Sequence, residues 1–183
     1  MRESFDANVI GNIHLINLFL PLILKGDAKK DIILSTGLAH IELTNEYDVA
    51  PAPLYSISKA ALNMMVAKFS ARYKQEGVLF LALSPGVVDT GNYDAGLSPP
   101  TLACTLVRDN SLRLTYVRTA TPEQLEKAAK SMMAKFSLYA PEWKGPITPE
   151  QSVSLMQKVI SDVSIEKGNG GGFLSHWGNQ RWL

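Results

Sequence analysis

Tyr55 and Lys59, four positions apart, are the side chains in this sequence whose types and spacing best suit proton transfer. On a helix this spacing places both side chains on one face. A neighbouring ammonium favours the phenolate, so we expect Lys59 to lower the pKa of Tyr55 from about 10 toward neutrality. Tyr55 would then be a usable general acid or base. The plainer alternative is a solvated helix face on which the pair has no function.

The hydrophobic pattern around this pair predicts helices that alternate with buried strands. Apolar residues recur at helical spacing over residues 4–24 and 54–75. The short apolar runs at 32–34 and 78–83 show no polar alternation, which is typical of parallel strands buried on both faces. Strands separated by helices predict an α/β fold with helices on both faces of the sheet.

The remaining segments give weaker signals. Residues 38–53 and 86–119 are predicted to be loops, and a loop as long as the second often carries function. Thr121 and Thr148 are each followed by Pro-Glu-Gln. This order predicts a threonine N-cap, a proline at the first helical position and a glutamine that closes a capping box.

The composition is that of one ordinary globular domain. The 183 residues are 46% hydrophobic and carry a net charge of +1, so nothing favours nucleic acid or an anionic membrane surface. One cysteine, Cys104, excludes an internal disulfide and favours a cytoplasmic location. Residues 15–24 are about half of the roughly 20 residues of a membrane span, so we expect a core helix and no membrane contact. The spacing of the histidines predicts no metal site.

The segments around the pair resemble the short-chain dehydrogenase/reductase family, in order and in spacing. Four of them carry this resemblance over residues 4–92: Asn8-Val-Ile-Gly, Ser35-Thr36-Gly, Tyr55-Ser-Ile-Ser-Lys59 and Ser-Pro85-Gly86-Val-Val-Asp-Thr90. Gly171-Gly-Phe-Leu174 looks like the last strand of the family. The resemblance implies a single domain over 1–183 with a partial doubly wound, Rossmann-like parallel sheet, in which 93–145 form a variable, substrate-side insertion.

The resemblance also implies a role for each matching residue. Tyr55 corresponds to the acid/base that exchanges a proton with the substrate, and Lys59 to the residue that lowers its pKa and binds the nicotinamide ribose. Asn8 looks like the asparagine that holds a relay water. The serine that polarises the substrate is matched by Thr36, which the strand register favours, or by Ser35. The residues that resemble further contacts to the nicotinamide end of the cofactor are Pro85, Gly86 and Thr90.

One motif of the family, the pyrophosphate-binding turn Thr-Gly-x-x-x-Gly-x-Gly, is not found in the sequence. The glycine-rich stretch 168–172 leads into Phe173-Leu174 instead of a helix, which does not suit phosphate. We therefore expect a sheet that lacks the N-terminal cofactor-binding strands, with one edge of strand 32–34 uncovered. The resemblance implies NAD or NADP, but the missing turn argues against ordinary binding of either by this chain.

The resemblance implies an NAD(P)-dependent oxidoreductase that acts on a carbonyl or a secondary alcohol of a small molecule. Two alternatives stay open: a cofactor-independent isomerase, dehydratase or cyclase that uses Tyr55 and Lys59, and a non-catalytic oligomerisation module. We also expect a homo-oligomer through the helices 4–24 and 54–75, or a partner that covers the free strand edge. The sequence identifies neither the substrate nor the choice between NAD and NADP.

Overall fold

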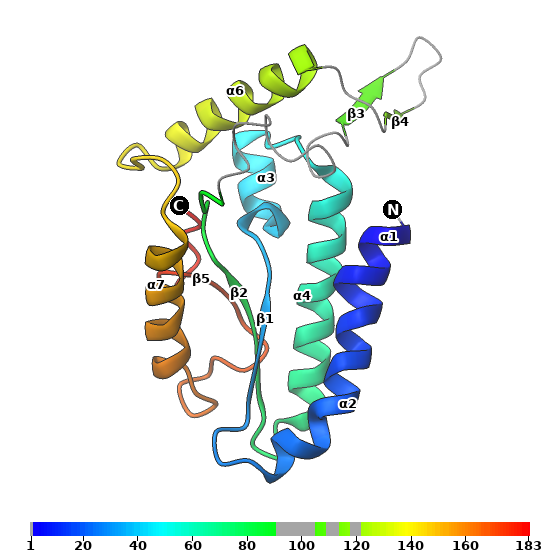
Figure 1. Ribbon diagram of the computed structural model, residues 1–183, viewed down its shortest axis with the longest axis vertical. Helices are drawn as coiled ribbons and strands as arrows, with labels where there is room; N and C mark the ends of the chain where they lie inside the picture. Colours follow the sequence, from blue (N-terminus) through cyan, green and yellow to red (C-terminus); the bar gives the residue numbers. More distant parts are fainter. Residues whose placement is uncertain (1, 91–104, 109–113, 118–121) are drawn as a thin grey trace.

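The centre of the molecule is a parallel sheet of three strands (Figure 1). The structure is a computed structural model that describes residues 2–90, 105–108, 114–117 and 122–183. The strands β1 (Lys30–Leu34), β2 (Leu79–Ser84) and β5 (Phe173–Ser175) lie in the order β1-β2-β5. Both pairings are parallel, and β2 is buried along its whole length. The predicted α/β fold with a partial parallel sheet is confirmed.

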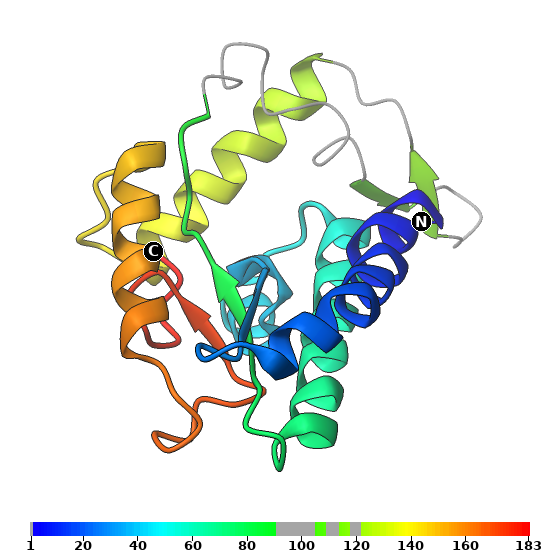
Figure 2. The ribbon, with the colours of Figure 1, turned by 60° about the horizontal axis from the view of Figure 1, so that its bottom comes forward.

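Helices cover both faces of the sheet (Figure 2). The helices α2 (Gly11–Lys25) and α4 (Pro53–Tyr73) lie on one face and α7 (Pro149–Asp162) lies on the other. Successive side chains of a strand point to opposite faces, so an uninterrupted apolar run on β2 can fill two cores. The first core contains Phe80, Ala82, Ile16, Leu62 and Val66, and the second contains Leu79, Leu81, Leu83, Val159 and Val163.

The first helix is longer and less buried than predicted. A helical run formed by α1 (Arg2–Phe5), a π-helical turn η1 (Asp6–Ile10) and α2 extends from Arg2 to Lys25. By length and composition alone it could cross a membrane, because its best 18-residue window has a mean hydropathy of 1.7, and 11% of that window is buried. The prediction of a buried core helix is therefore confirmed for one face of the helix only. Ile16 and Leu20 are buried, whereas Leu18 and Leu22 are 70% and 64% exposed.

Both predicted loops contain regular structure. Residues 38–53 include a 3₁₀ turn, η2 (Gly37–Ala39), and the helix α3 (Ile41–Tyr47). The Nδ1 atom of His40 caps α3 by accepting a hydrogen bond from the Leu43 N–H, a short-range contact that hydrophobic periodicity does not reveal. Within 86–119, β3 (Thr105–Arg108) and β4 (Leu114–Val117) form an antiparallel pair.

The helix starts were predicted well because their signals are local. In the capping box of α7, Thr148 Oγ1 accepts from the Gln151 N–H at 3.2 Å, and Gln151 Oε1 accepts from the Thr148 N–H at 2.9 Å. This confirms the prediction at Thr148. Thr121 lies outside the described residues, and α6 (Pro122–Tyr139) begins at the residue after it.

Candidate active site

The predicted site residues gather at the carboxyl ends of β1 and β2, the edge of a parallel sheet where ligands bind in open α/β folds. Thr36 follows β1, Pro85 and Gly86 follow β2, and Tyr55 lies in the first turn of α4. This end of the sheet lies next to α3 and α6 (Figure 1). The fold thus brings together residues from segments that are far apart in the sequence.

The Thr36 side chain lies near the hydroxyl of Tyr55 and interacts with it. Burial raises the pKa of Tyr55 above its usual value, and the interaction with Thr36 offsets part of this rise. The expectation that Lys59 lowers this pKa is therefore wrong. The physical reason is burial, which disfavours the phenolate, while the Lys59 ammonium donates to the Leu34 carbonyl at 2.8 Å and lies 5.9 Å from the centre of the Tyr55 ring.

Lys59 extends from α4 to the free edge of β1. Backbone groups of a strand alternate between its two sides, and the Ser35 N–H donates toward β2, to the Leu83 carbonyl at 2.8 Å. The backbone groups of Ile32 and Leu34 therefore face away from β2. Of these, the Leu34 carbonyl accepts a hydrogen bond from the Lys59 ammonium. Burial lowers the pKa of Lys59. An ammonium thus stands where the outer edge of the sheet meets the site.

Ser35 and Thr36, the two candidates for the substrate-polarising hydroxyl, have different surroundings. Ser35 is buried and donates to Asn63 Oδ1 at 2.6 Å, whereas Thr36 contacts Tyr55. Of the two candidates, Thr36 is therefore the one that lies beside Tyr55, and the Ser35 hydroxyl is occupied by Asn63. Sequence reasoning missed Asn63, although its position four residues after Lys59 places it on the same face of α4.

Asn8 lies in the π-helical turn η1 and is joined to the backbone of Tyr55. Its Nδ2 atom donates to Ser58 Oγ at 2.9 Å, and Ser58 Oγ donates to the Tyr55 carbonyl at 2.8 Å. Asn12 Nδ2 in turn donates to the Asn8 carbonyl at 2.9 Å. Turns of this kind inside a helix are frequent at functional sites. Ser58, three residues after Tyr55, is a second residue that sequence reasoning missed.

The turn after β2 requires its glycine. Gly86 has a φ of 84°, and a Cβ atom there would lie 2.6 Å from Cε1 of His176. The imidazole of His176 is buried, so it cannot move into solvent to make room for a side chain. Pro85 and Gly86 thus form the turn at the carboxyl end of β2, whereas Thr90 is exposed beyond the bridge between Val88 and Ile147.

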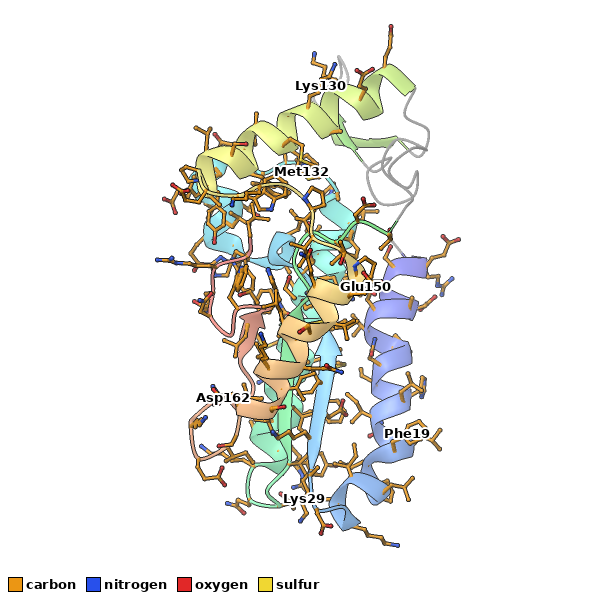
Figure 3. The ribbon with its side chains drawn as sticks, turned by 60° about the vertical axis from the view of Figure 1, so that its left-hand side comes forward. Phe19, Lys29, Lys130, Met132, Glu150 and Asp162 are labelled. Carbon is orange, nitrogen blue, oxygen red and sulfur yellow. The ribbon has the colours of Figure 1, made fainter. Side chains whose placement is uncertain are left out.

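An apolar cluster borders Tyr55. It combines the start of α4 with residues from α6 and the C-terminal segment, and Met132 is labelled on α6 in Figure 3. Its members besides Tyr55 are Leu38, Ala52, Val87, Met132, Met133, Phe136, Trp143 and Leu183. A substrate that reaches the Tyr55 hydroxyl would therefore meet an apolar surface beside it.

A groove of about 500 Å³ lies between α2 and the free edge of β1. Leu15 and Phe19 of α2 form one wall, and Phe19 lies on the side of α2 away from α7 (Figure 3). The β1 wall runs from Lys30 to Leu34, and Lys59 reaches the groove from α4. The edge predicted to be uncovered is open in this structure.

Residues 1–96 match the family model described as short chain dehydrogenase, over the part of the chain that holds Asn8, Thr36, Tyr55 and Lys59. This chain belongs to the short-chain dehydrogenase family. It is 46% identical to "Short chain dehydrogenase virK" of Hypocrea virens and 40% identical to "Short-chain dehydrogenase/reductase iacC" of Pestalotiopsis fici.

Both matches include 99% of this chain but 58% and 57% of those two relatives, so the chain spans less than two thirds of their length. Among solved structures, a carbonyl reductase from chicken fatty liver with bound NADPH matches 98% of this chain and 55% of its own. That match has a TM-score of 0.63 at 24% identity, which shows a shared fold.

NAD(P) is the cofactor of the family. Lys59 reaches the end of β1, and Pro85 and Gly86 follow β2, so the three lie at the carboxyl edge where ligands bind in open α/β folds. The glycine-rich stretch does not fit the pyrophosphate, because its N–H groups serve the fold: Gly171 donates to the Phe80 carbonyl at 2.8 Å and Gly172 to the Asn169 carbonyl at 3.0 Å. Within the described ranges no group of three or more His, Cys, Asp or Glu could hold a metal ion.

Proposed function

We propose that this chain carries the proton-transfer part of a short-chain oxidoreductase that reduces a carbonyl group of a small, largely apolar molecule, or oxidises the corresponding alcohol. The observation that supports this proposal is that the Thr36 and Tyr55 side chains lie together at the carboxyl end of β1, beside an apolar cluster. A nicotinamide, when bound, supplies or accepts the hydride. The proton transfer falls to side chains of this chain.

In this proposal Tyr55 donates the proton. Burial raises its pKa, so at neutral pH the hydroxyl is protonated and can give a proton to a substrate oxygen that carries developing negative charge. Thr36 donates a hydrogen bond to the same oxygen and polarises the carbonyl. Asn8 and Ser58 hold the backbone of Tyr55 in place through their two hydrogen bonds.

The test is a turnover assay with NADPH or NADH and a panel of aromatic and aliphatic ketones and aldehydes. The chain is assayed alone and mixed with a separately produced piece of the virK relative, the part that lies outside the match. We expect turnover in the mixture and a fall of about 10²- to 10⁴-fold in Tyr55→Phe. Tyr73→Phe, a change on the same helix but at its far end, is the matched control.

The outcomes separate the three functions considered from the sequence. Turnover that survives in Tyr55→Phe, or no turnover in any mixture, contradicts the proposal. Chemistry on the same panel without nicotinamide, lost in Tyr55→Phe, supports the cofactor-independent enzyme. A biological effect that both Tyr55→Phe and Lys59→Ala leave intact supports the association module.

We further propose that an extended polypeptide segment covers the free edge of β1. The Leu34 carbonyl accepts from Lys59, but another strand can pair with the outward backbone groups of Ile32, and the groove under α2 offers it an apolar wall. The relatives are longer than this chain, and we propose that a segment corresponding to their unmatched part supplies this strand. In the mixture described above, amide exchange of Ile32 should slow, and unchanged exchange would contradict this.

A second copy of the chain is the partner we propose for the outer side of α2 and α4. Leu18 and Leu22 of α2 and Met64 of α4 are all at least 60% exposed, and the two leucines are four residues apart on one side of the helix. Such a stripe can pack against its own copy across a two-fold axis. The polar rim that this interface needs is present at both ends of the helical run, in Arg2 and Lys25.

A further inference from the structure

The C-terminal segment packs directly against the turn that carries Thr36. Trp182 is 2% exposed, and its Cβ and Cγ atoms lie 2.6 and 2.8 Å from the position that a Cβ atom on Gly37 would take. No residue other than glycine therefore fits at position 37 while the tryptophan stays in place. Trp182 therefore contacts the backbone of a turn that lies 145 residues earlier in the sequence.

Trp182 is itself held firmly. Its ring stacks on Phe173 of β5 at 4.2 Å with an interplanar angle of 24° and lies 5.0 Å from the ring of His40. Its backbone N–H donates to the hydroxyl of Tyr139, at the end of α6, at 3.1 Å. The indole is thus fixed to β5, α6 and the residue before α3, so it can hold the Thr36 turn in place. The C-terminus lies near the same end of the sheet in Figure 1.

One polar atom of this arrangement lacks a partner. The Nε1 atom of Trp182 is buried and makes no hydrogen bond with the described residues. An unpaired buried N–H is costly, and ordered water is its usual remedy. A cavity of about 30 Å³ adjoins the indole, and its lining includes Thr36, Gly37, Ser84, Gly86 and Trp182. This is close to the volume of one water molecule, and the lining supplies the polar partners that a water needs.

Ser84 supplies the second partner for that water. Its Oγ atom accepts from the Gly37 N–H at 3.2 Å, and a hydroxyl oxygen can accept a second hydrogen bond. A water that accepts from Trp182 Nε1 can therefore donate to Ser84 Oγ. The chain of contacts then runs from the indole through water and Ser84 to the backbone N–H next to Thr36.

We propose that Trp182 is a positioning residue for Thr36, and that one bound water in this cavity links its indole N–H to Ser84. The tryptophan touches neither substrate nor Tyr55. It acts by holding the Thr36 turn in the conformation that directs the threonine hydroxyl to Tyr55. This inference rests on the roles proposed above for Thr36 and Tyr55.

The test uses Trp182→Phe in the full chain, which keeps an aromatic ring over Gly37 and removes the N–H. Trp177→Phe is the matched control, because this tryptophan lies in the same segment but is 49% exposed. Tyrosine ring carbons labelled at Cζ report the pKa of Tyr55, and the indole N–H signals report contact with long-lived water. Neither measurement requires turnover.

In the unmodified chain we expect a water contact for the Trp182 indole N–H that resists exchange. Trp182→Phe should raise the pKa of Tyr55, with an ionisation constant about threefold lower, because the position of the Thr36 hydroxyl, which lowers this pKa, is loosened. Trp177→Phe should leave it unchanged. A Trp182→Phe chain that loses stability but keeps the pKa of Tyr55 would overturn the proposal, as would an indole without bound water.

These results also differ from a failure of the proposed oxidoreductase. If no turnover is found in the mixtures but the pKa of Tyr55 responds to Trp182→Phe and not to Trp177→Phe, the positioning role stands without the reaction. If turnover depends on Tyr55 and the pKa does not respond, the reaction stands and the positioning role fails.

Discussion

At the scale of single residues, the adjacent hydroxyls of Ser35 and Thr36 have different partners, so we expect their removal to have different effects. Ser35 donates to Asn63 Oδ1 at 2.6 Å, so Ser35→Ala leaves a half-buried acceptor without its donor and should lower the unfolding free energy by about 1–3 kcal/mol. Thr36→Val removes the hydroxyl that interacts with Tyr55 and should raise the pKa of that tyrosine. Urea unfolding and a tyrosine titration measure the two effects.

Thr36→Ser is the rescue variant for this pair of changes, because it restores a hydroxyl without the methyl group. It should return the pKa of Tyr55 to that of the unmodified chain. A rise of this pKa in Ser35→Ala, with none in Thr36→Val, would show that the two residues have been assigned the wrong way round.

The burial of Tyr55 also sets a dependence of stability on pH. Its pKa is raised in the folded state, so above about pH 10 the folded chain holds a proton that the unfolded chain has lost. The unfolding free energy that depends on Tyr55 is therefore fully present below about pH 10 and is lost as the pH rises through the folded pKa. In Tyr55→Phe this part of the loss should disappear.

Urea unfolding in a series from about pH 8 to 11 would measure this difference. Tyr73→Phe, in the same helix, serves again as the control. A Tyr55→Phe chain whose alkaline loss of stability equals that of the unmodified chain would mean that this hydroxyl is not buried as described.

At the scale of elements, α7 depends on the capping box at its first turn. Thr148→Ala removes the acceptor for the Gln151 N–H and should lower the unfolding free energy by about 1 kcal/mol. Ser154→Ala, an exposed change in the interior of the same helix, should be neutral or slightly stabilising. Thermal unfolding would show both, and an equal loss in the two variants would contradict a specific role of the cap.

The first helical run shows how one element can meet two demands. Within the π-helical turn η1, Asn8 donates to Ser58, and the Asn8 carbonyl accepts from Asn12. Farther along, α2 buries Ile16 and Leu20 on the sheet and leaves Leu18 and Leu22 exposed. One end of the run supports the site and the other presents an apolar surface.

At the scale of the whole molecule, this exposed surface predicts self-association. Leu18→Glu places a charge in the proposed two-fold contact and should convert a dimer to a monomer, as measured by sedimentation velocity. Val153→Glu, on α7 and 47% exposed before the change, is the matched control and should leave the dimer intact. Dissociation by both changes, or by neither, would contradict an interface through α2 and α4.

The sequence by itself determined the features that depend on neighbours in the chain. The alternation of helices and strands, the placement of Tyr55 and Lys59 on one helix face, and the capping box at Thr148 all follow from spacings of a few residues. These signals survive without knowledge of the fold, because hydrogen bonds and side-chain periodicity within an element involve only local geometry.

Only the tertiary structure decided which partner each site residue has. The choice of Thr36 over Ser35, the diversion of Lys59 to the Leu34 carbonyl and the contact of Trp182 with Gly37 join segments 19 to 145 residues apart. Such contacts depend on how strands and helices pack. Desolvation also depends on the tertiary structure. Lys59 was expected to lower the pKa of Tyr55, but burial by the surrounding apolar cluster raises it.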